Sequence, residues 1–412
     1  MLLLEGSNME NVTFEMINEA ARNLKGVIKE TDFCYAETLS ERVGGKVYLK
    51  LENLQQSGSF KIRGAYNKML HLTDEEKKCG VVASSAGNHA QGVAISATKL
   101  GIKSTIVMPK SAPFAKIFAT RNYGGEVVLE GEIYDDAYQK ALEIKEATCA
   151  TFVHPFNDPY VIAGQGTIGL ELMEEQPDLD VVLVPIGGGG IAAGIAMAVK
   201  TINPNIKVIG VQTKNAPSMH QALQDGKIGT IKVTKTIADG IAVATPGDLT
   251  FPMIQQYVDE IVTVSETEIS QAFLFLLEGC NLVCEGAGAV SVAAMLSNKV
   301  DLKDKKVGAI LSGGNIDTNL IESIINHAMM SLGRRTRIRV SIDDRPGELN
   351  AFLKTIAEEM GNVITIQQDR YREGLSMYHF GVSIVVETLD QAHKERLIHK
   401  LKESGYEIEY SN

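Results

Sequence analysis

Short runs of apolar, β-branched residues alternate with longer helical patterns between about residues 47 and 327. The runs are VYLKLE, GVVASSA, STIVMP, GGEVVLE, DVVLVPI, KVIGVQ, EIVTV and VGAILSGG. They are apolar on both faces, as strands must be when helices cover each side of a sheet. The pattern therefore predicts an α/β fold with a largely parallel sheet. Ligands bind such sheets beyond the carboxyl ends of the strands, so the Gly, Ser and Asn residues that follow the runs mark the expected site.

The pattern changes after HAMMSLGRRTR. IRVSI, NVITIQQDR, YHFGVSIVVE and YEIEY read as strands, and DRPGELNAFLKTIAEEM and LDQAHKERLIHKLKESG read as helices. The order βαββαβ over about eighty residues is typical of a ferredoxin-like unit with its own core. We therefore expect a domain boundary near Gly333.

Charge and composition narrow the class of ligand. The formal net charge of -11 and a pI near 5.4 argue against a nucleic-acid binder, which grips phosphates with clustered Lys and Arg. Ligands are expected to be small molecules. The five cysteines are odd in number and scattered, so we expect neither a disulfide framework nor a metal site, and infer a reducing compartment. The segment MLLLEGSNM lacks a signal-peptide core and no apolar run is long enough to span a bilayer, which together favour a cytoplasmic protein without membrane contact.

A run of four glycines, Gly187, Gly188, Gly189 and Gly190, lies between a buried strand and a helix. Such a run can turn its amides inward, and the positive end of the following helix favours an anion, so it predicts a phosphate site. A tight turn is the alternative. The run also satisfies the dinucleotide pattern GxGxxA, but the next strand ends in Gln212 rather than in the acidic residue that would hold the ribose hydroxyls. A phosphorylated cofactor without a ribose pair fits better.

Lys61, in SGSFKIRGAYNKML, stands where a helix begins. The positive end of a helix favours the neutral amine, which is a nucleophile toward carbonyls. A lone lysine at a helix start is more often a solvated side chain. Beside a phosphate site it takes another meaning, because pyridoxal 5'-phosphate needs both an amine for its aldehyde and a cradle for its phosphate.

Two further strand ends carry polar residues. In VVASSAGNHAQGVA, residues Ser85, Ala86, Gly87, Asn88 and His89 lead into a helix, so their amides and hydroxyls could hold a carboxylate, and Asn88 could bond a phenolic oxygen of a cofactor. A capped turn explains the same residues equally well.

In GAILSGGN, Ser312 follows a buried strand. Its hydroxyl could face a ring nitrogen or could cap the next helix.

Taken together and in this order, SFKIRGA, SSAGNHAQG, PIGGGG, CEGAGA and LSGGN resemble the threonine dehydratases (threonine ammonia-lyases) of the fold type II pyridoxal-phosphate family. The resemblance covers about residues 10 to 327. It implies a catalytic domain over residues 1–330, built from two parallel-sheet subdomains, with the smaller one, about 54–157, inserted in the larger.

The resemblance also implies a role for each motif. Lys61 would form the Schiff base and remove the α-proton, Phe60 would pack near the ring, and Gly187 to Gly190 would hold the phosphate. Asn88 would bond the ring hydroxyl and Ser312 the pyridine nitrogen. The substrate carboxylate would lie against Ser85, Ala86, Gly87 and His89. Glu285 of CEGAGA would lie near the ring. The product would be a 2-oxo acid and ammonia.

Two positions separate this chain from related activities. Serine racemases of the fold carry an acid/base serine where this chain has Ala86, so elimination is expected to dominate over racemisation. Those relatives bind a divalent cation through a Glu where this chain has Gln212, so we predict no such metal. A serine-preferring dehydratase or racemase remains the alternative within the fold. An NAD-dependent oxidoreductase and a non-catalytic amino-acid sensor are the alternatives of other classes.

Residues 334–412 resemble an ACT domain, a regulatory module of amino-acid enzymes. The turn DDRPGEL would offer an effector site for an amino acid or nucleotide, formed by Asp344, Pro346, Gly347 and Glu348. The same residues also suit an ordinary turn and first helical turn. The family implies a homodimer or homotetramer. The sequence leaves open whether the pathway leads to isoleucine or to degradation.

Overall fold

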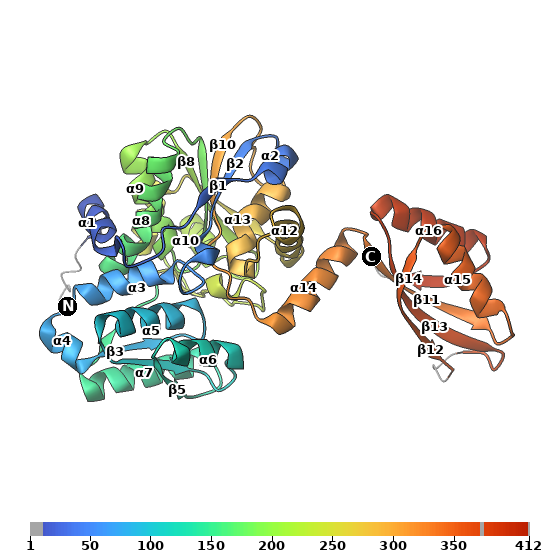
Figure 1. Cartoon of the computed structure of the whole chain (residues 1–412), viewed down its shortest axis with the longest axis horizontal. Helices are drawn as coiled ribbons and strands as arrows, with labels where there is room; N and C mark the ends of the chain where they lie inside the picture. The colour runs from blue at the N-terminus through green and yellow to red at the C-terminus, as the bar shows by residue number, and fades with distance from the viewer. Residues whose placement is uncertain (1–10, 371–374, 411–412) are drawn as a thin grey trace. The chain divides into compact units, whose positions relative to one another are not determined.

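The strands of the computed structural model form three β-sheets within residues 11–370 and 375–410, the residues that the structure describes (Figure 1). The chain divides into two units, Met1–Asp317 and Thr318–Asn412. Two of the sheets belong to the first unit and one to the second. The segment MLLLEGSNM lies outside the described residues.

The larger sheet of the first unit has six strands in the order β1-β2-β10-β7-β8-β9. Only the edge pair of β1 with β2 is antiparallel, and the other pairs are parallel. The bounds are β1 (Phe33–Tyr35), β2 (Lys46–Lys50), β7 (Val181–Pro185), β8 (Lys207–Thr213), β9 (Glu260–Val264) and β10 (Lys306–Ile310).

Strand β7 shows why the runs read as apolar throughout. Val182 and Val184 pack into the core on one face of the sheet, and Val181 and Leu183 pack into the core on the other. Alternate side chains of a strand point to opposite faces, so a strand covered on both sides must be apolar at every position.

The smaller sheet has four parallel strands in the order β5-β4-β3-β6. Their bounds are β3 (Val81–Ser84), β4 (Ser104–Met108), β5 (Glu126–Leu129) and β6 (Thr151–Phe152). The side chains of β3 also divide between two cores, with Ala83 on one face and Val82 on the other.

Helices cover both sheets of the first unit. Those that precede or flank the smaller sheet are α3 (Lys61–Leu70), α4 (Asp74–Cys79), α5 (Asn88–Leu100), α6 (Phe114–Asn122) and α7 (Tyr134–Thr148). The others are α1 (Phe14–Leu24), α2 (Glu37–Val43), α8 (Pro159–Glu175), α9 (Gly190–Ile202), α10 (Ser218–Asp225), α11 (Thr250–Tyr257), α12 (Glu266–Gly279) and α13 (Gly286–Leu296), with short 3-10 helices η1 (Glu52–Leu54) and η2 (Asp239–Ile241).

The second unit begins with helix α14 (Thr318–Ser331), which the expected boundary near Gly333 would have left with the first domain. An antiparallel sheet in the order β12-β13-β11-β14 follows. The bounds are β11 (Arg335–Asp343), α15 (Glu348–Glu358), β12 (Asn362–Asp369), β13 (His379–Glu387), α16 (Gln391–Glu403) and β14 (Ile408–Tyr410).

The predicted α/β class and the βαββαβ order of the second unit are confirmed. The cysteines were expected to form no disulfide framework, and the structure contains one disulfide among the described residues, between Cys79 and Cys149. Cys79 ends α4 and Cys149 follows α7, and these positions lie side by side because the strands that follow them, β3 and β6, are neighbours. Among the helices in the described ranges, none combines the length and apolar character that a membrane crossing needs.

Candidate active site

The carboxyl ends of strands from both sheets of the first unit face one cavity of about 900 Å³. Residues after β3 and β6 reach it from the smaller sheet, and residues after β7 and β10 reach it from the larger. All the site residues expected in this unit line it: Phe60, Lys61, Ser85, Ala86, Gly87, Asn88, His89, Gly187, Gly188, Gly189, Gly190, Glu285 and Ser312. The structure thus brings together segments that are far apart in the sequence.

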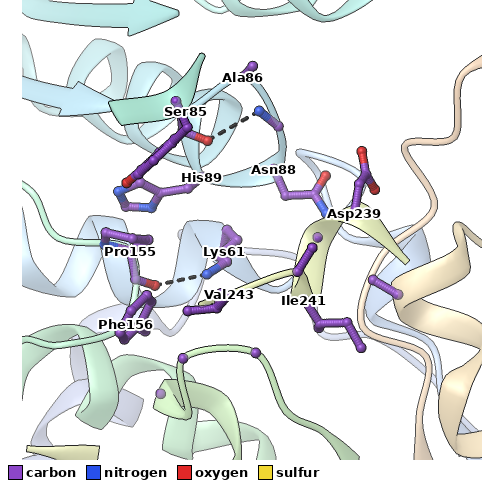
Figure 2. A pocket seen from close by; sticks show the side chains of 18 of the residues that line it. Lys61, Ser85, Ala86, Asn88, His89, Pro155, Phe156, Asp239, Ile241 and Val243 are labelled. Carbon is purple, nitrogen blue, oxygen red and sulfur yellow. Dashed lines mark hydrogen bonds between the residues drawn. The ribbon is translucent and has the colours of Figure 1, made fainter. Parts of the chain in front are cut away.

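Lys61 is the first residue of α3, and its amine points into the cavity (Figure 2). The Nζ atom donates a hydrogen bond of 2.8 Å to the carbonyl oxygen of Pro155 and lies 5.0 Å from the centre of the Phe60 ring. Burial lowers the pKa of Lys61 to about 8, and the charge of Glu285 opposes that shift only in part. A minority of the amine, far more than for an ordinary lysine, is therefore neutral near physiological pH and can act as a nucleophile.

The backbone around Lys61 packs tightly between two helices. A Cβ atom on Gly92 of α5 would lie 3.0 Å from the carbonyl carbon of Lys61, and one on Gly164 of α8 would lie 2.4 Å from the carbonyl oxygen of Arg63. The approach at Gly164 is closer than a Cβ atom allows, and the one at Gly92 leaves a side chain very little room. The start of α3 is thus held from two sides.

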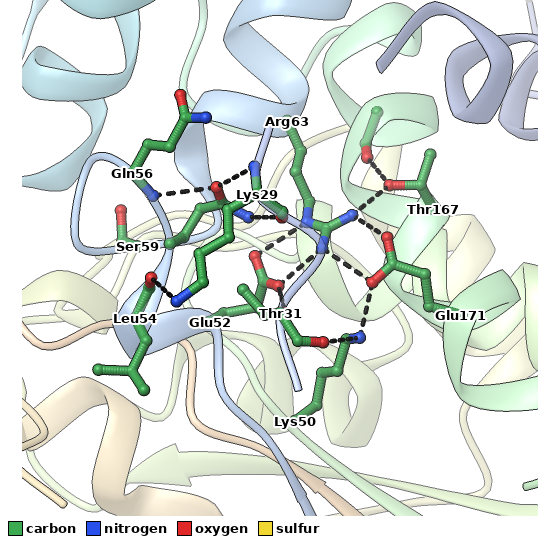
Figure 3. A network of polar contacts seen from close by, with 12 residues as sticks. Lys29, Thr31, Lys50, Glu52, Leu54, Gln56, Ser59, Arg63, Thr167 and Glu171 are labelled. Carbon is green, nitrogen blue, oxygen red and sulfur yellow. Dashed lines mark hydrogen bonds and ion pairs between the residues drawn. The ribbon is translucent and has the colours of Figure 1, made fainter. Parts of the chain in front are cut away.

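A buried network of charges anchors α3 further (Figure 3). The Arg63 guanidinium, fully buried, donates to both carboxylate oxygens of Glu52, at 2.8 and 2.7 Å, and also to Glu171. Lys50, also fully buried, lies 2.7 Å from Glu171. Paired, fully bonded charges define one geometry where an apolar contact would allow several.

The glycine loop forms a cradle between β7 and α9. Gly189 has φ of 104°, in the left-handed region that side chains disfavour, and Gly190 begins the helix of 13 residues. A Cβ on Gly188 would lie 2.3 Å from the ring of Phe156, so the ring packs directly on the loop. The buried Thr250 holds the loop by donating from Oγ1 to the carbonyl oxygen of Gly188 at 2.6 Å. Such a loop at a helix start suits a phosphate group.

Residues 85–89 connect β3 to the start of α5 and lie above Lys61 in the view of Figure 2. The Ser85 hydroxyl accepts from the amide of Gly87 at 3.2 Å, which shapes the turn. The buried His89 ring bonds through Nε2 to the carbonyl oxygen of Val153 at 2.8 Å. Burial lowers the pKa of His89 to about 3, so its ring is neutral and donates this bond.

Asn88 and Glu285 line another part of the cavity and are bonded to each other. Asn88 donates from Nδ2 to Oε1 of Glu285 at 2.6 Å and accepts through Oδ1 from Asn315 at 2.8 Å. Burial, with the nearby charge of Asp239, raises the pKa of Glu285 to about 7, against the opposing effects of Lys116 and other groups. Lys116 itself pairs with Asp239 at 2.8 Å across the cavity rim.

Ser312 follows β10 and is buried at the cavity wall, where its carbonyl oxygen also accepts from the amide of Phe60 at 3.1 Å.

The four residues of the expected effector site, Asp344, Pro346, Gly347 and Glu348, lie in the second unit at the turn between β11 and α15. There Asp344 pairs with Arg370, and Asp343 lies 2.8 Å from His379.

Gln212, which the sequence singled out, does not line the cavity. Its side chain donates to the carbonyl oxygens of Ile186 and Ala216 and accepts from the amide of His220.

Several cavity residues escaped the sequence analysis, among them Lys116, Pro155, Phe156, Gln165 and Asp239. HPFND follows β6 in the way that the other motifs follow their strands. This position after a strand could have identified Pro155 and Phe156 as candidate site residues. Lys116, Gln165 and Asp239 come from helices, where nothing in the pattern distinguishes them.

Comparison with known proteins gives matches over this unit and beyond. Residues 24–313 match the family model described as pyridoxal-phosphate dependent enzyme. An L-threonine ammonia-lyase of Thermotoga maritima is 53% identical over 397 residues, covering 96% of this chain and 99% of the relative.

Solved structures agree in fold. The processed form of threonine deaminase isoform 2 from Solanum lycopersicum is similar with a TM-score of 0.74 and 38% identity, covering 80% of this chain and 92% of that one. Maize serine racemase gives a TM-score of 0.73 and 36% identity, covering 78% of this chain and 99% of that one.

Proposed function

The chain belongs to the pyridoxal-phosphate-dependent enzyme family, and on that premise we propose that it is an L-threonine ammonia-lyase. It converts L-threonine to 2-oxobutanoate and ammonia, and L-serine to pyruvate as a second reaction. One observation carries the proposal: the buried, partly neutral amine of Lys61 shares a cavity with a glycine cradle at the start of a helix. The relative of 53% identity, matched over nearly its whole length, bears the same activity in its name.

The residues present fit the cofactor, pyridoxal 5'-phosphate. The loop at Gly187–Gly190 would hold its phosphate, since side chains are absent where the group must approach the backbone. Lys61 would hold its aldehyde carbon, Asn88 would bond its ring hydroxyl, and Ser312 would face its ring nitrogen. When bound, the cofactor supplies an electron sink that weakens the bond between the α-carbon of the amino acid and its proton.

The chain's own groups have distinct tasks in this proposal. The turn Ser85–His89, at the start of α5, binds and orients the substrate carboxylate. Lys61 removes the α-proton, because its lowered pKa leaves a neutral amine at the point where the substrate must lie. Pro155 offers its carbonyl oxygen to Lys61 Nζ and so holds the amine when it is not otherwise engaged.

Ala86 favours elimination over racemisation. Racemisation needs an acid or base on each face of the substrate, and the methyl group at position 86 offers neither. The similarity to maize serine racemase shows a shared fold and leaves racemisation as the second candidate. Pyruvate and D-serine are measured after L-serine is added to the same preparation. An enzyme that eliminates releases pyruvate without accumulating D-serine, and a racemase accumulates D-serine.

The experiment that tests the proposal is a visible spectrum of the purified protein before and after L-threonine, with 2-oxobutanoate measured in the same sample. A cofactor band that changes as 2-oxobutanoate accumulates supports it. Lys61→Ala should abolish turnover while the fold survives, and Lys68→Ala, a change on the same helix outside the cavity lining, should retain it. A protein that stays colourless with added pyridoxal 5'-phosphate would contradict the proposal and favour the amino-acid sensor.

For the second unit we propose regulation. At the turn between β11 and α15, Asp344 pairs with Arg370 and Asp343 lies 2.8 Å from His379, and these polar groups could contact an amino acid or nucleotide. An ACT-like unit also suits a homodimer or homotetramer, and a cytoplasmic location remains part of the proposal. Turnover measured with and without added amino acids and nucleotides, in wild type and in Asp344→Ala, tests the effector site.

A further inference from the structure

Gln165 is a buried polar side chain in the cavity wall with one end unpartnered. It lies in the middle of α8 and is 1% exposed. Its Nε2 atom donates a long hydrogen bond of 3.4 Å to the carbonyl oxygen of Pro155. Its Oε1 atom is buried and has no hydrogen-bond partner among the described residues. A buried polar atom without a partner is unfavourable and calls for an explanation.

The two ends of this side chain face the two groups that the cofactor needs. The Nε2 end shares the Pro155 carbonyl oxygen with Lys61, whose Nζ atom lies 2.8 Å from it. The Oε1 end lies against the glycine cradle, where a Cβ on Gly190 would be 2.7 Å from it. Gln165 therefore connects the position of the amine to the position of the expected phosphate.

The orientation of the amide decides what each end can do. An oxygen that faces an anion site is repelled by the anion, while an NH₂ group there donates to it. The oxygen and nitrogen of a glutamine amide have nearly the same shape, so rotation about the last torsion exchanges them in place. The exchanged amide would point its NH₂ group at the cradle and place its oxygen beside the Pro155 carbonyl oxygen, to which Lys61 Nζ donates.

We propose that Gln165 is a further binding residue of this site, whose amide donates to the phosphate of the cofactor at the Gly190 end of the cradle and accepts from the free amine of Lys61 at the other end. This inference rests on the proposed function, because it requires the cofactor. It assigns the orphaned oxygen a partner and links occupancy of the phosphate site to the placement of the amine.

The test compares two ligands that differ only in the phosphate. Cofactor-stripped wild type, Gln165→Met and Gln165→Glu are titrated with pyridoxal 5'-phosphate and with pyridoxal, and the dissociation constants are measured from the visible absorbance. Gln165→Met should weaken binding of pyridoxal 5'-phosphate by about tenfold more than binding of pyridoxal, as expected when a hydrogen bond to a charged group is lost. Gln165→Glu, of the same shape, should lose more, since its carboxylate faces the phosphate.

The control is Gln55→Met. Gln55 is also a buried glutamine of the first unit, but its amide is fully bonded to Lys29 and Gln56, and it does not line the cavity. Its substitution should leave the ratio of the two dissociation constants unchanged. An unchanged ratio in both Gln165 variants, or an equal change in the control, overturns the inference. If one Gln165 variant fails to fold, the ratio in the other decides. Failure of wild type to bind either ligand would instead overturn the proposed function.

Discussion

Asn88 donates a hydrogen bond of 2.6 Å to Glu285 and so joins the two sheets of the first unit across the cavity. Asn88 begins α5, which packs on the smaller sheet, and Glu285 caps α13, which packs on the larger one. The carboxyl group of Glu285 is buried at this junction, with its pKa raised to about 7 by burial and by Asp239. Its protonation therefore affects both the packing of the unit and the charge of the cavity.

The stability of the protein should reflect this carboxyl group. Glu285 has a pKa of about 7 in the folded chain against 4.5 for an ordinary Glu, so between these pH values the folded state holds a proton that the unfolded state has released. The free energy of unfolding should therefore fall as the pH rises from about 4.5 to 7, by on the order of 3 kcal/mol. Denaturant unfolding of Glu285→Gln at several pH values should lack this fall. Glu146→Gln, on the exposed face of α7, should behave as wild type. Parallel curves for all three proteins would contradict the prediction.

Lys61 should combine with the cofactor at a lower pH than an ordinary lysine. Its pKa is lowered to about 8 from 10.5 because burial disfavours the charged form. The neutral amine is the reacting species, so the rate at which cofactor-stripped protein takes up pyridoxal 5'-phosphate should reach half its maximum near pH 8. The rate is measured from the visible absorbance. A midpoint above pH 10 would show that burial does not act on the amine as described.

A methyl group at Gly188 should damage the cradle. The added Cβ would lie 2.3 Å from the ring of Phe156, which must then move. Gly188→Ala should lower the free energy of unfolding by about 1–3 kcal/mol and weaken binding of pyridoxal 5'-phosphate. Gly229→Ala is the matched control, because a Cβ there meets nothing within 4 Å, and it should leave both quantities unchanged. Equal behaviour of the two variants would exclude the steric argument.

The buried network around Arg63 should be essential for stability. Arg63→Met leaves Glu52 fully buried without its partner, and such a change costs about 3–5 kcal/mol. Lys207→Met removes a surface pair with Glu260, in which the side chains are 46% and 44% exposed, and should cost less than about 1 kcal/mol. Urea unfolding compares the two. A small loss for Arg63→Met would indicate that the glycine contacts of α3 hold the helix without the network.

The bond between Cys79 and Cys149 leaves three free thiols of five: Cys34, Cys280 and Cys284. Thiol titration of the denatured, unreduced protein should therefore give three groups, and five after reduction. Reduction should also lower the free energy of unfolding by about 2–4 kcal/mol, because the bond closes a long loop between residues with a sequence separation of 70. Five thiols without reductant would contradict the prediction and show that all five cysteines are reduced, as their scattered positions led us to expect.

The sequence sufficed for those strands that are buried on both faces, because each is an apolar run long enough to recognise. It missed β1 and β6, which have only three and two residues and carry no pattern of their own. The missed disulfide has the same cause. Cys79 and Cys149 meet because β6 pairs with β3, and that pairing is a long-range event that residue spacing does not express.

The site follows the same division. Residues that follow recognisable strands, such as Asn88 and Ser312, are candidates from their positions, and only the family resemblance separates a role in the site from an ordinary helix cap. Asp239 and Lys116 meet across the rim from a 3-10 helix and from α6, and only the folded chain places them together. The roles of the individual site residues remain predictions that the experiments above address.

The bare backbone at Gly92 and Gly164 sets a limit on how this chain can vary. Neither residue lines the cavity, yet a side chain on either would push against the backbone of Lys61 or Arg63 and tilt the helix that carries the amine. An effort to redesign the substrate range must therefore keep glycine at these two positions, although neither belongs to the cavity wall. A side chain at either position would displace the start of α3, so the absence of a Cβ atom at both positions sets the direction of the amine.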